Sequence, residues 1–204
     1  MKVVRTEYLI KSNFEQLESV WKELLTEIKD AVTNVVWPPG NDKFVFNSSA
    51  TGRGRGEGNG VKPIKQLFCA NLKNLGWELE TRMNLGSRRV PGPIDAIKRT
   101  SVGVFAVEWE TGNISSSHRA INKMVYGILT GEIVGGALLL PTREMYRYLT
   151  DRVGNFEELE PYFPVWKAVN VQKSAVLAVI AVEHDGTSPS VPRIPKGTDG
   201  RALV

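Results

Sequence analysis

Three acidic residues carry the clearest chemistry in this sequence. Asp95 stands at the start of one apolar run, and Glu108 and Glu110 belong to a second run that begins at Val102. Both runs are typical of β-strands, in which residues i and i+2 point to the same face. We therefore expect Glu108 and Glu110 to face the same way, and Asp95 to join them if the two strands form an antiparallel pair.

These carboxylates predict a metal site. Acidic groups that share a partly buried site repel one another, and desolvation adds to the free-energy cost of keeping them charged. A hard divalent cation with oxygen ligands relieves both effects, which makes Mg²⁺ the natural candidate and Asp95 and Glu108 its ligands. The alternative interpretation is that Glu110 is a solvated strand end and Asp95 a turn residue.

The stretch around these residues resembles the catalytic core of type II restriction endonucleases. The usual pattern there is Pro-Asp, a spacer and then Asp/Glu-x-Lys, whereas this sequence has Gly-Pro-Ile-Asp95 and carries Glu110 in place of the lysine. Glu-x-Glu is found in the BamHI-type branch of the family. Residues 58–65, 109–119 and 149–155 resemble that branch too, so the resemblance covers nearly the whole chain.

The resemblance implies a fold and an activity. The fold is α/β, with a restriction-endonuclease-like core in which a central mixed sheet is flanked by helices on both faces, and the order of predicted elements agrees with it. The activity is Mg²⁺-dependent hydrolysis of double-stranded DNA at a short palindrome, GGATCC, leaving 5′-phosphate and 3′-hydroxyl ends. A palindrome implies a homodimer in which each subunit cuts one strand.

Further catalytic roles follow from the same resemblance. Glu110 acts as the general base or helps to bind a second metal ion. Glu80, on the preceding predicted strand, is a third metal ligand, with Glu78 as the competing assignment because the strand phase there is open. Lys98 lies near Asp95 and is either a phosphate contact or a surface lysine.

The residues that contact DNA are also predicted. By resemblance, the base-reading residues are Asn113, Ser115, Arg119, Asp151 and Arg152. Arginine suits guanine, asparagine suits adenine, and aspartate accepts from the cytosine amino group. The alternatives are a surface ion pair between Asp151 and Arg152, and a turn role for Asn113. We expect three basic residues in or beside the glycine-rich loop 51–60 to contact the DNA backbone: Arg53, Arg55 and Lys62.

Composition limits the other possibilities. The chain has 204 residues, 42% of them hydrophobic and 24% charged, which fits one endonuclease domain spanning 1–204. The net charge is +4, and ten Lys/Arg against four Asp/Glu between 51 and 100 suit a polyanion. We expect no membrane span, because the apolar runs are too short, and no signal peptide, because the N-terminus lacks a long apolar segment. We expect no nucleotide cofactor, because the glycine spacing in 51–60 fits no nucleotide motif. Cys69 is the single cysteine, which excludes a disulfide within the chain and fits the cytoplasm.

The element boundaries follow from periodicity and capping residues. Four helices are predicted. The first has a Ser12–Glu15 capping box and an apolar stripe that runs to Val32, and the second runs from Pro63 to Gly76. The third is capped by Ser116 or Ser117 and ends at Gly131, and the fourth runs from 142 to 152. The predicted strands are 44–46, 77–81, 94–98, 101–110, 133–140 and 175–182. About one helical turn is expected in 156–166, and residues 185–204 read as an irregular arm. The dimer interface is left open between the helices 117–129 and 142–152.

The sequence supports the alternative functions less well. His118 and His184 are the only histidines, and neither lies beside a convincing nucleophile, which disfavours serine hydrolysis and a histidine-based zinc site. A catalytically silent DNA-binding protein on the same fold remains the alternative. A silent binder has no reason to keep Asp95, Glu108 and Glu110 together, so the sequence favours the nuclease.

Overall fold

A mixed β-sheet forms the centre of the molecule. The computed structural model describes residues 1–51, 57–82, 92–150 and 153–196. The strands of a six-stranded sheet follow the order β1-β7-β6-β5-β4-β3. They are β1 (Lys2–Ser12), β3 (Glu78–Thr81), β4 (Ile94–Thr100), β5 (Gly103–Trp109), β6 (Gly135–Pro141) and β7 (Ala175–Glu183). β5, β6 and β7 run parallel, and the remaining neighbours are antiparallel.

The neighbouring strands β6 and β7 are apolar along almost their whole length. Every residue of β6 is buried, and so is every residue of β7 except Glu183. Such continuous apolar runs are typical of strands that are covered on both faces. The predictions of buried strands at 133–140 and 175–182 are confirmed.

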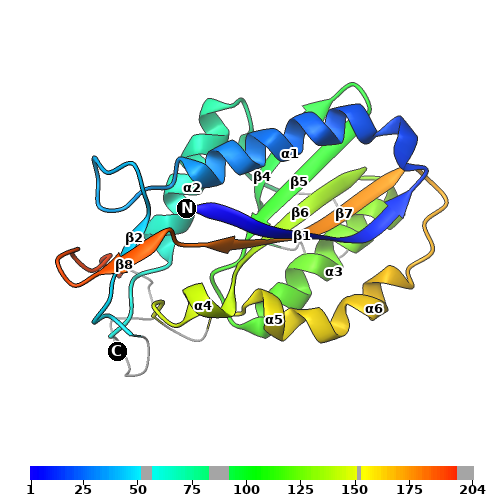
Figure 1. Ribbon diagram of the computed structural model, residues 1–204. Helices are drawn as coiled ribbons and strands as arrows, with labels where there is room; N and C mark the ends of the chain where they lie inside the picture. The colour runs from blue at the N-terminus through cyan, green and yellow to red at the C-terminus, as the bar shows by residue number, and fades with distance from the viewer. Residues whose placement is uncertain (52–56, 83–91, 151–152, 197–204) are drawn as a thin grey trace.

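Helices cover both faces of this sheet. They are η1 (Phe14–Gln16), α1 (Glu18–Thr33), α2 (Lys62–Asn74), α3 (Ile114–Thr130), α4 (Arg143–Tyr146), α5 (Phe156–Leu159), η2 (Glu160–Tyr162) and α6 (Phe163–Lys167). α1 and α2 pack on one face, where Trp21 stacks on Phe105, and α3, α5 and α6 pack on the other (Figure 1). The predicted α/β fold is therefore confirmed. Among the described residues, no helix is long and apolar enough to cross a membrane.

The N-terminal boundary differs from the prediction. Residues 2–12, where no strand is predicted above, form the edge strand β1. The expected Ser12 cap is wrong, because the Ser12 hydroxyl donates to the carbonyl of Val171 at 2.6 Å. Asn13 instead precedes η1 in a left-handed conformation with φ 41°, and its side chain makes no cap hydrogen bond.

Two helix predictions are also corrected. α3 begins after Asn113, whose side chain accepts from the amide of Ser116, so a cap at Ser116 or Ser117 is wrong. Gly131 does end this helix, at a φ of 82° that favours glycine. Thr142 caps α4 as expected, but α4 ends at Tyr146 and does not run on toward residue 152.

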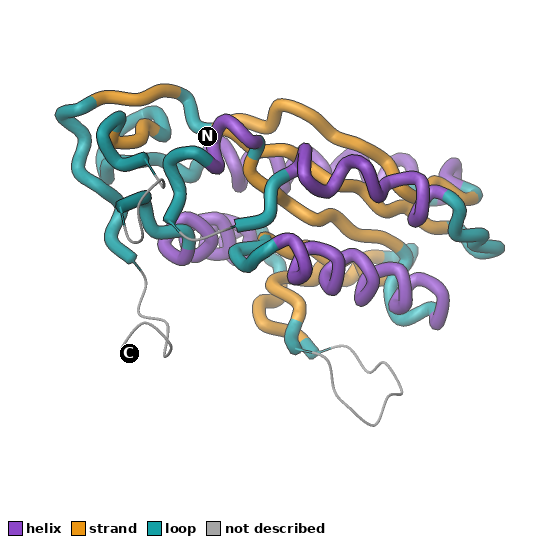
Figure 2. Tube along the Cα trace, turned by 90° about the horizontal axis from the view of Figure 1, so that it is seen from below, coloured by secondary structure: helices purple, strands orange, loops and turns teal. Residues whose placement is uncertain are grey.

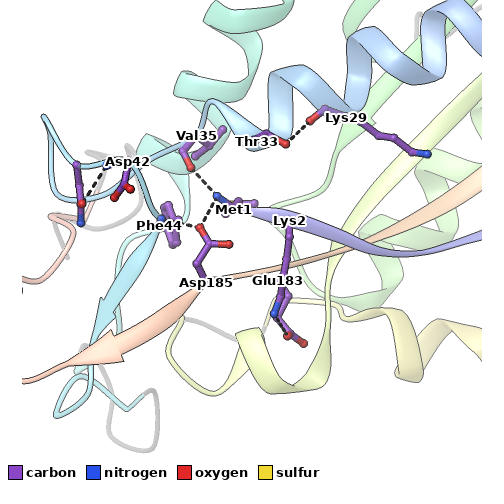
Figure 3. Close-up of polar contacts among 10 residues, drawn as sticks. Met1, Lys2, Lys29, Thr33, Val35, Asp42, Phe44, Glu183 and Asp185 are labelled. Carbon is purple, nitrogen blue, oxygen red and sulfur yellow. Dashed lines mark hydrogen bonds and ion pairs between the residues drawn. The ribbon is translucent and has the colours of Figure 1, made fainter.

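The predicted irregular arm is partly ordered against the rest of the chain. Gly186–Ser188 forms β8, which pairs in parallel with β2 (Val45–Asn47). The N-terminal ammonium of Met1 lies 3.0 Å from Asp185 Oδ2 and donates to the carbonyl of Val35, so this corner is tied to the end of β7 (Figure 3). Both views place the N-terminus at the end of the molecule where β2 and β8 lie (Figures 1 and 2).

Candidate active site

The β4–β5 hairpin brings the predicted acids together. Ala96 pairs with Val107, so Asp95 and Glu108 are the next residues on the two strands. Both are buried, with 5% and 7% of their surfaces exposed. Beside them lies a cavity of about 640 Å³, lined by Lys65, Glu80, Gly92, Pro93, Asp95, Glu108, Glu110, Ser116, Arg119, Ala120 and Lys123. The structure thus places Asp95, Glu108, Glu110 and Glu80 around one space.

Each carboxylate oxygen of Asp95 has a bonding partner. Its Oδ2 accepts a hydrogen bond from the backbone amide of Trp109 at 2.7 Å. Its Oδ1 lies 2.6 Å from the ammonium of Lys65. Asp95 is therefore a buried strand residue with a fixed orientation, and the interpretation of it as a turn residue is wrong.

Glu108 is buried beside a second lysine, Lys123, which forms an ion pair with its Oε1. Burial and the neighbouring charge of Asp95 raise the pKa of Glu108 to about 7, although Lys123 and Lys65 oppose the change. The ammonium of Lys123 faces Oε1, so a positive charge already lies beside this buried oxygen. A buried carboxylate that needs a neighbouring cation is a feature that a bound metal ion would also satisfy.

Glu110 and Glu80 lie on the cavity wall in more exposed positions. Glu110 follows β5, and its Oε1 accepts from the amide of Gly112 at 2.6 Å. Glu80 has a φ of 52°, which is uncommon for a residue other than glycine. Glu78 makes an exposed ion pair with Arg99 at 3.0 Å and does not line the cavity. Of the two competing assignments, Glu80 is thus the residue that faces the other acids.

Sequence reasoning missed the two lysines of the cavity. Lys65 lies on α2 and Lys123 on α3, far from the hairpin in sequence. Ser116, Arg119 and Lys123 follow helical spacing and share a face of α3, which is the pattern that could have pointed to Lys123. Lys98 lies outside the cavity, where its Nζ is 3.3 Å from the carboxylate of Glu27.

Three of the predicted base-reading residues lie at the start of α3. Asn113, Ser115 and Arg119 are exposed, and Arg119 borders the cavity and donates to the Ser116 hydroxyl at 2.7 Å. Asn113 also caps the helix, which gives it a structural role. The amide of Gly154 donates to the carbonyl of Gly112 at 2.8 Å. The segment that follows Asp151 and Arg152, the other two predicted base-reading residues, therefore reaches the start of α3.

The remaining DNA contacts are only partly within the described structure. Lys62 is exposed and is the first residue of α2, one helical turn before Lys65. Four predicted residues lie outside the described residues: Arg53, Arg55, Asp151 and Arg152.

Asn59 is a further residue that sequence reasoning did not single out. Its side chain is fully buried. Its Nδ2 donates to the carbonyl of Tyr148 at 2.8 Å, and its Oδ1 accepts from the amide of Ile194 at 3.0 Å. One asparagine therefore joins three segments, at 59, 148 and 194. Gly60 allows this approach, because a Cβ there would lie 2.1 Å from the carbonyl oxygen of Pro195.

Cys69, His118 and His184 do not line the cavity. Burial, and then the charge of Asp95, raises the pKa of Cys69 to about 12, which keeps this residue a neutral thiol. His118 packs with Tyr162 at a ring distance of 4.6 Å. His184 is buried beside Phe46, and this burial lowers its pKa. The expectation that neither histidine works with a nucleophile agrees with these positions.

The donor set fits a hard divalent cation. The cavity offers carboxylate oxygens from Asp95, Glu108, Glu110 and Glu80, which are the kind of ligand that Mg²⁺ prefers. Within the described part of the chain, no three His, Cys, Asp or Glu side chains are grouped closely enough to hold a metal as they stand. Lys65 and Lys123 lie against the two buried carboxylates instead.

Comparison with known proteins identifies the family. The sequence model of the family described as restriction endonuclease BamHI matches residues 1–201. The chain is 51% identical over 203 residues to the type II restriction enzyme OkrAI of Oceanobacter kriegii, with 100% of both chains covered. It is 34% identical over 186 residues to the type II restriction enzyme BamHI of Bacillus amyloliquefaciens, covering 88% of this chain and 82% of BamHI.

A solved structure supports the fold. The crystal structure of the restriction endonuclease BglII complexed with a DNA 16-mer has a TM-score of 0.55 and 10% sequence identity, and it covers 91% of this chain and 79% of BglII. The fold, the acidic cavity and these relatives together define a type II restriction endonuclease. The chain belongs to the BamHI family of restriction endonucleases.

Proposed function

We propose that this enzyme hydrolyses double-stranded DNA at GGATCC in a Mg²⁺-dependent reaction and leaves 5′-phosphate and 3′-hydroxyl ends. The whole chain, 1–204, acts as one endonuclease domain in the cytoplasm, where its single cysteine stays reduced. The observation that carries the proposal is the convergence of two buried acids, Asp95 and Glu108, with Glu110 in one open cavity. A silent DNA-binding protein would gain nothing from the desolvation cost of these acids.

The acidic residues divide the work of hydrolysis. Asp95, Glu108 and Glu80 hold Mg²⁺, which supplies Lewis acidity and stabilises negative charge on the phosphate. Glu110 accepts one proton of the attacking water at a carboxylate oxygen, the bond between phosphorus and the 3′ oxygen breaks, and the leaving 3′ oxygen takes a proton from solvent water. The hydrogen bond from Gly112 to Glu110 keeps that carboxylate aimed along the cavity wall, which is the positioning that a general base needs.

The start of α3 reads bases beside the acids. Asn113, Ser115 and Arg119 contact base edges, while Asp151 and Arg152 read the outer pair of the site. Support comes from the position of α3, whose first residues follow Glu110 directly and border the cavity through Arg119. The residues that bind the backbone are Lys62, Arg53 and Arg55.

A second copy of the chain completes the enzyme, because a palindrome presents the same sequence on both strands. We place the interface on α3 and α6. Tyr126 and Leu129 of α3 are 45% and 51% exposed, and Val165 of α6 is 65% exposed. α3 and α6 pack together where Trp166 donates to Asn122, so these apolar side chains belong to neighbouring helices (Figure 1). Leu129→Glu should shift the dimer toward monomer in sedimentation.

A digest of a plasmid of known sequence tests the cleavage proposal. With Mg²⁺, every cut should map to GGATCC, the new ends should be ligatable and carry 5′-phosphates, and EDTA should abolish cutting. Cuts at a different sequence would refute the proposed specificity while leaving the nuclease assignment intact. Binding to GGATCC without any cleavage in Mg²⁺ would instead favour the silent DNA-binding protein.

A further inference from the structure

Two lysines occupy the positions that a metal ion would need. The ammonium of Lys65 lies 2.6 Å from Asp95 Oδ1, where the two side chains are 26% and 7% exposed. The ammonium of Lys123 contacts Glu108 Oε1, where the side chains are 16% and 9% exposed. Both contacts are less exposed than the surface pair of Arg99 and Glu78, whose side chains are 62% and 52% exposed.

These ion pairs are made by separate elements. Lys65 reaches the hairpin from α2, and Lys123 reaches it from α3. Lys123 is held at this place by two further acceptors, the carbonyls of Gly92 and Pro93, at 3.4 and 3.2 Å. For Lys65, desolvation is the largest single effect and would lower the pKa, but the charge and hydrogen bond of Asp95 together with the charge of Glu108 outweigh it, so the pKa is raised and this lysine stays charged.

A metal ion and an ammonium group cannot share one carboxylate oxygen without strong repulsion. Charges of the same sign a few ångströms apart repel, and a site of low water content screens them poorly. Asp95 Oδ2 already accepts a hydrogen bond from the amide of Trp109, so Oδ1 is the oxygen with more free acceptor capacity, and Lys65 lies on it. The same argument applies to Lys123 and the otherwise unpartnered Oε1 of Glu108.

We propose that Lys65 and Lys123 are the resident cations of the DNA-free centre, and that a divalent metal binds only by displacing them from Asp95 and Glu108. The lysines thereby weaken metal binding by the free enzyme and keep two buried carboxylates neutralised until the metal arrives. This inference rests on the proposed metal site, and it adds a role for two residues outside the acidic motif. Lys123 keeps its two carbonyl acceptors after displacement, so it has an alternative position close by.

Metal binding to the DNA-free protein tests the inference without any measurement of cleavage. Mn²⁺ is the probe, because it takes carboxylate oxygen ligands and free Mn²⁺ is counted directly by electron paramagnetic resonance. The variants are Lys65→Met and Lys123→Met. The matched control is Lys98→Met, which removes the same charge from an ion pair with Glu27 outside the cavity. A buffer at pH 8.5 limits protonation of the carboxylates.

Both cavity variants should bind Mn²⁺ about tenfold more tightly or better, since one unit charge near a weakly screened site has at least this effect. The Lys98 control should bind like the unchanged protein. Equal or weaker binding by both cavity variants would overturn the inference. Lys65→Gln and Lys123→Gln, which keep a polar head, repeat the comparison if a methionine variant does not fold.

Asp95→Ala separates a failure of this inference from a failure of the metal site. If Asp95→Ala loses Mn²⁺ binding while the lysine variants leave it unchanged, the proposed site stands and the role of the lysines is wrong. If Asp95→Ala binds Mn²⁺ as well as the unchanged protein does, the metal does not bind here, and both proposals fail.

Discussion

The buried carboxyl group of Glu108 predicts an unusual link between pH and stability. Glu108→Gln removes its charge and keeps its shape, so the variant retains the packing of a side chain that is 9% exposed in the native protein. Burial raises the pKa of Glu108 from 4.5 to about 7 in the folded protein. The ionised carboxylate of Glu108 therefore destabilises the metal-free fold, and Glu108→Gln should remove this destabilisation.

The magnitude follows from the difference between the two pKa values. A difference of about 2.5 pH units at 1.36 kcal/mol each is about 3 kcal/mol. Because the pKa of Glu108 is higher in the folded protein than in the unfolded chain, the protonated carboxyl group stabilises the fold. This contribution is fully present below pH 4.5 and is lost as the pH rises through about 7. Between pH 5 and pH 8 the native protein should lose about 2 to 3 kcal/mol of unfolding free energy that the variant keeps.

The assay is urea unfolding at pH 5 and pH 8 in EDTA, for the native protein and the variant. Glu110→Gln is the matched control, because Glu110 lines the same cavity but is only half-buried, and a glutamine can still accept from Gly112. The control should follow the native protein. If Glu108→Gln loses as much stability between the two pH values as the native protein does, Glu108 is not the strained acid that its burial indicates.

Substitutions at four residues test the site and its supports. Glu110→Gln should lose most cleavage but keep binding to GGATCC in Ca²⁺, and substantial cleavage by Glu110→Lys, measured on the same DNA, would refute the base role. Asn59→Ala should lower the unfolding free energy in urea by about 2 to 3 kcal/mol, because the buried amide of Ile194 loses its acceptor; a change below about 0.5 kcal/mol would contradict this. Arg119→Ala should weaken cognate binding about tenfold to a hundredfold, depending on the base pair present. Lys62→Ala should weaken binding to the cognate site and to altered sites alike. Binding of both variants in Ca²⁺ to sites altered at a single base pair distinguishes a base contact from a backbone contact. A uniform loss of affinity for Arg119→Ala would show that Arg119 is a backbone contact.

The local part of the site was predictable from the sequence. Asp95 and Glu108 lie on two adjacent strands, Glu110 follows the second strand directly, and the predicted two-residue period agrees with Glu108 and Glu110 lining the same cavity. β1 was missed because its pairing with β7 has irregularities between Val3 and Arg5 and between Tyr8 and Ile10. These interrupt the alternation on which strand prediction depends.

Positions that depend on tertiary packing could not be predicted. Lys65 and Lys123 meet the acids only because α2 and α3 pack on opposite faces of the sheet beside one hairpin. Asn59 looks like an ordinary loop residue until the segments at 148 and 194 close around it. The start of α3 was misplaced because Asn113 and the serines after it are all good capping residues, and local sequence does not choose among them.

One paired measurement on Asp95→Ala tests most directly whether the acidic cavity is the catalytic centre. Binding to a GGATCC duplex is measured in Ca²⁺, and cleavage of the same duplex is measured in Mg²⁺. We predict that the variant binds the duplex and discriminates against altered sites, yet does not cut either strand, because the buried carboxylate of Asp95 serves the metal and not a base contact. Cleavage at a rate close to that of the native enzyme would contradict the account and place the catalytic centre elsewhere.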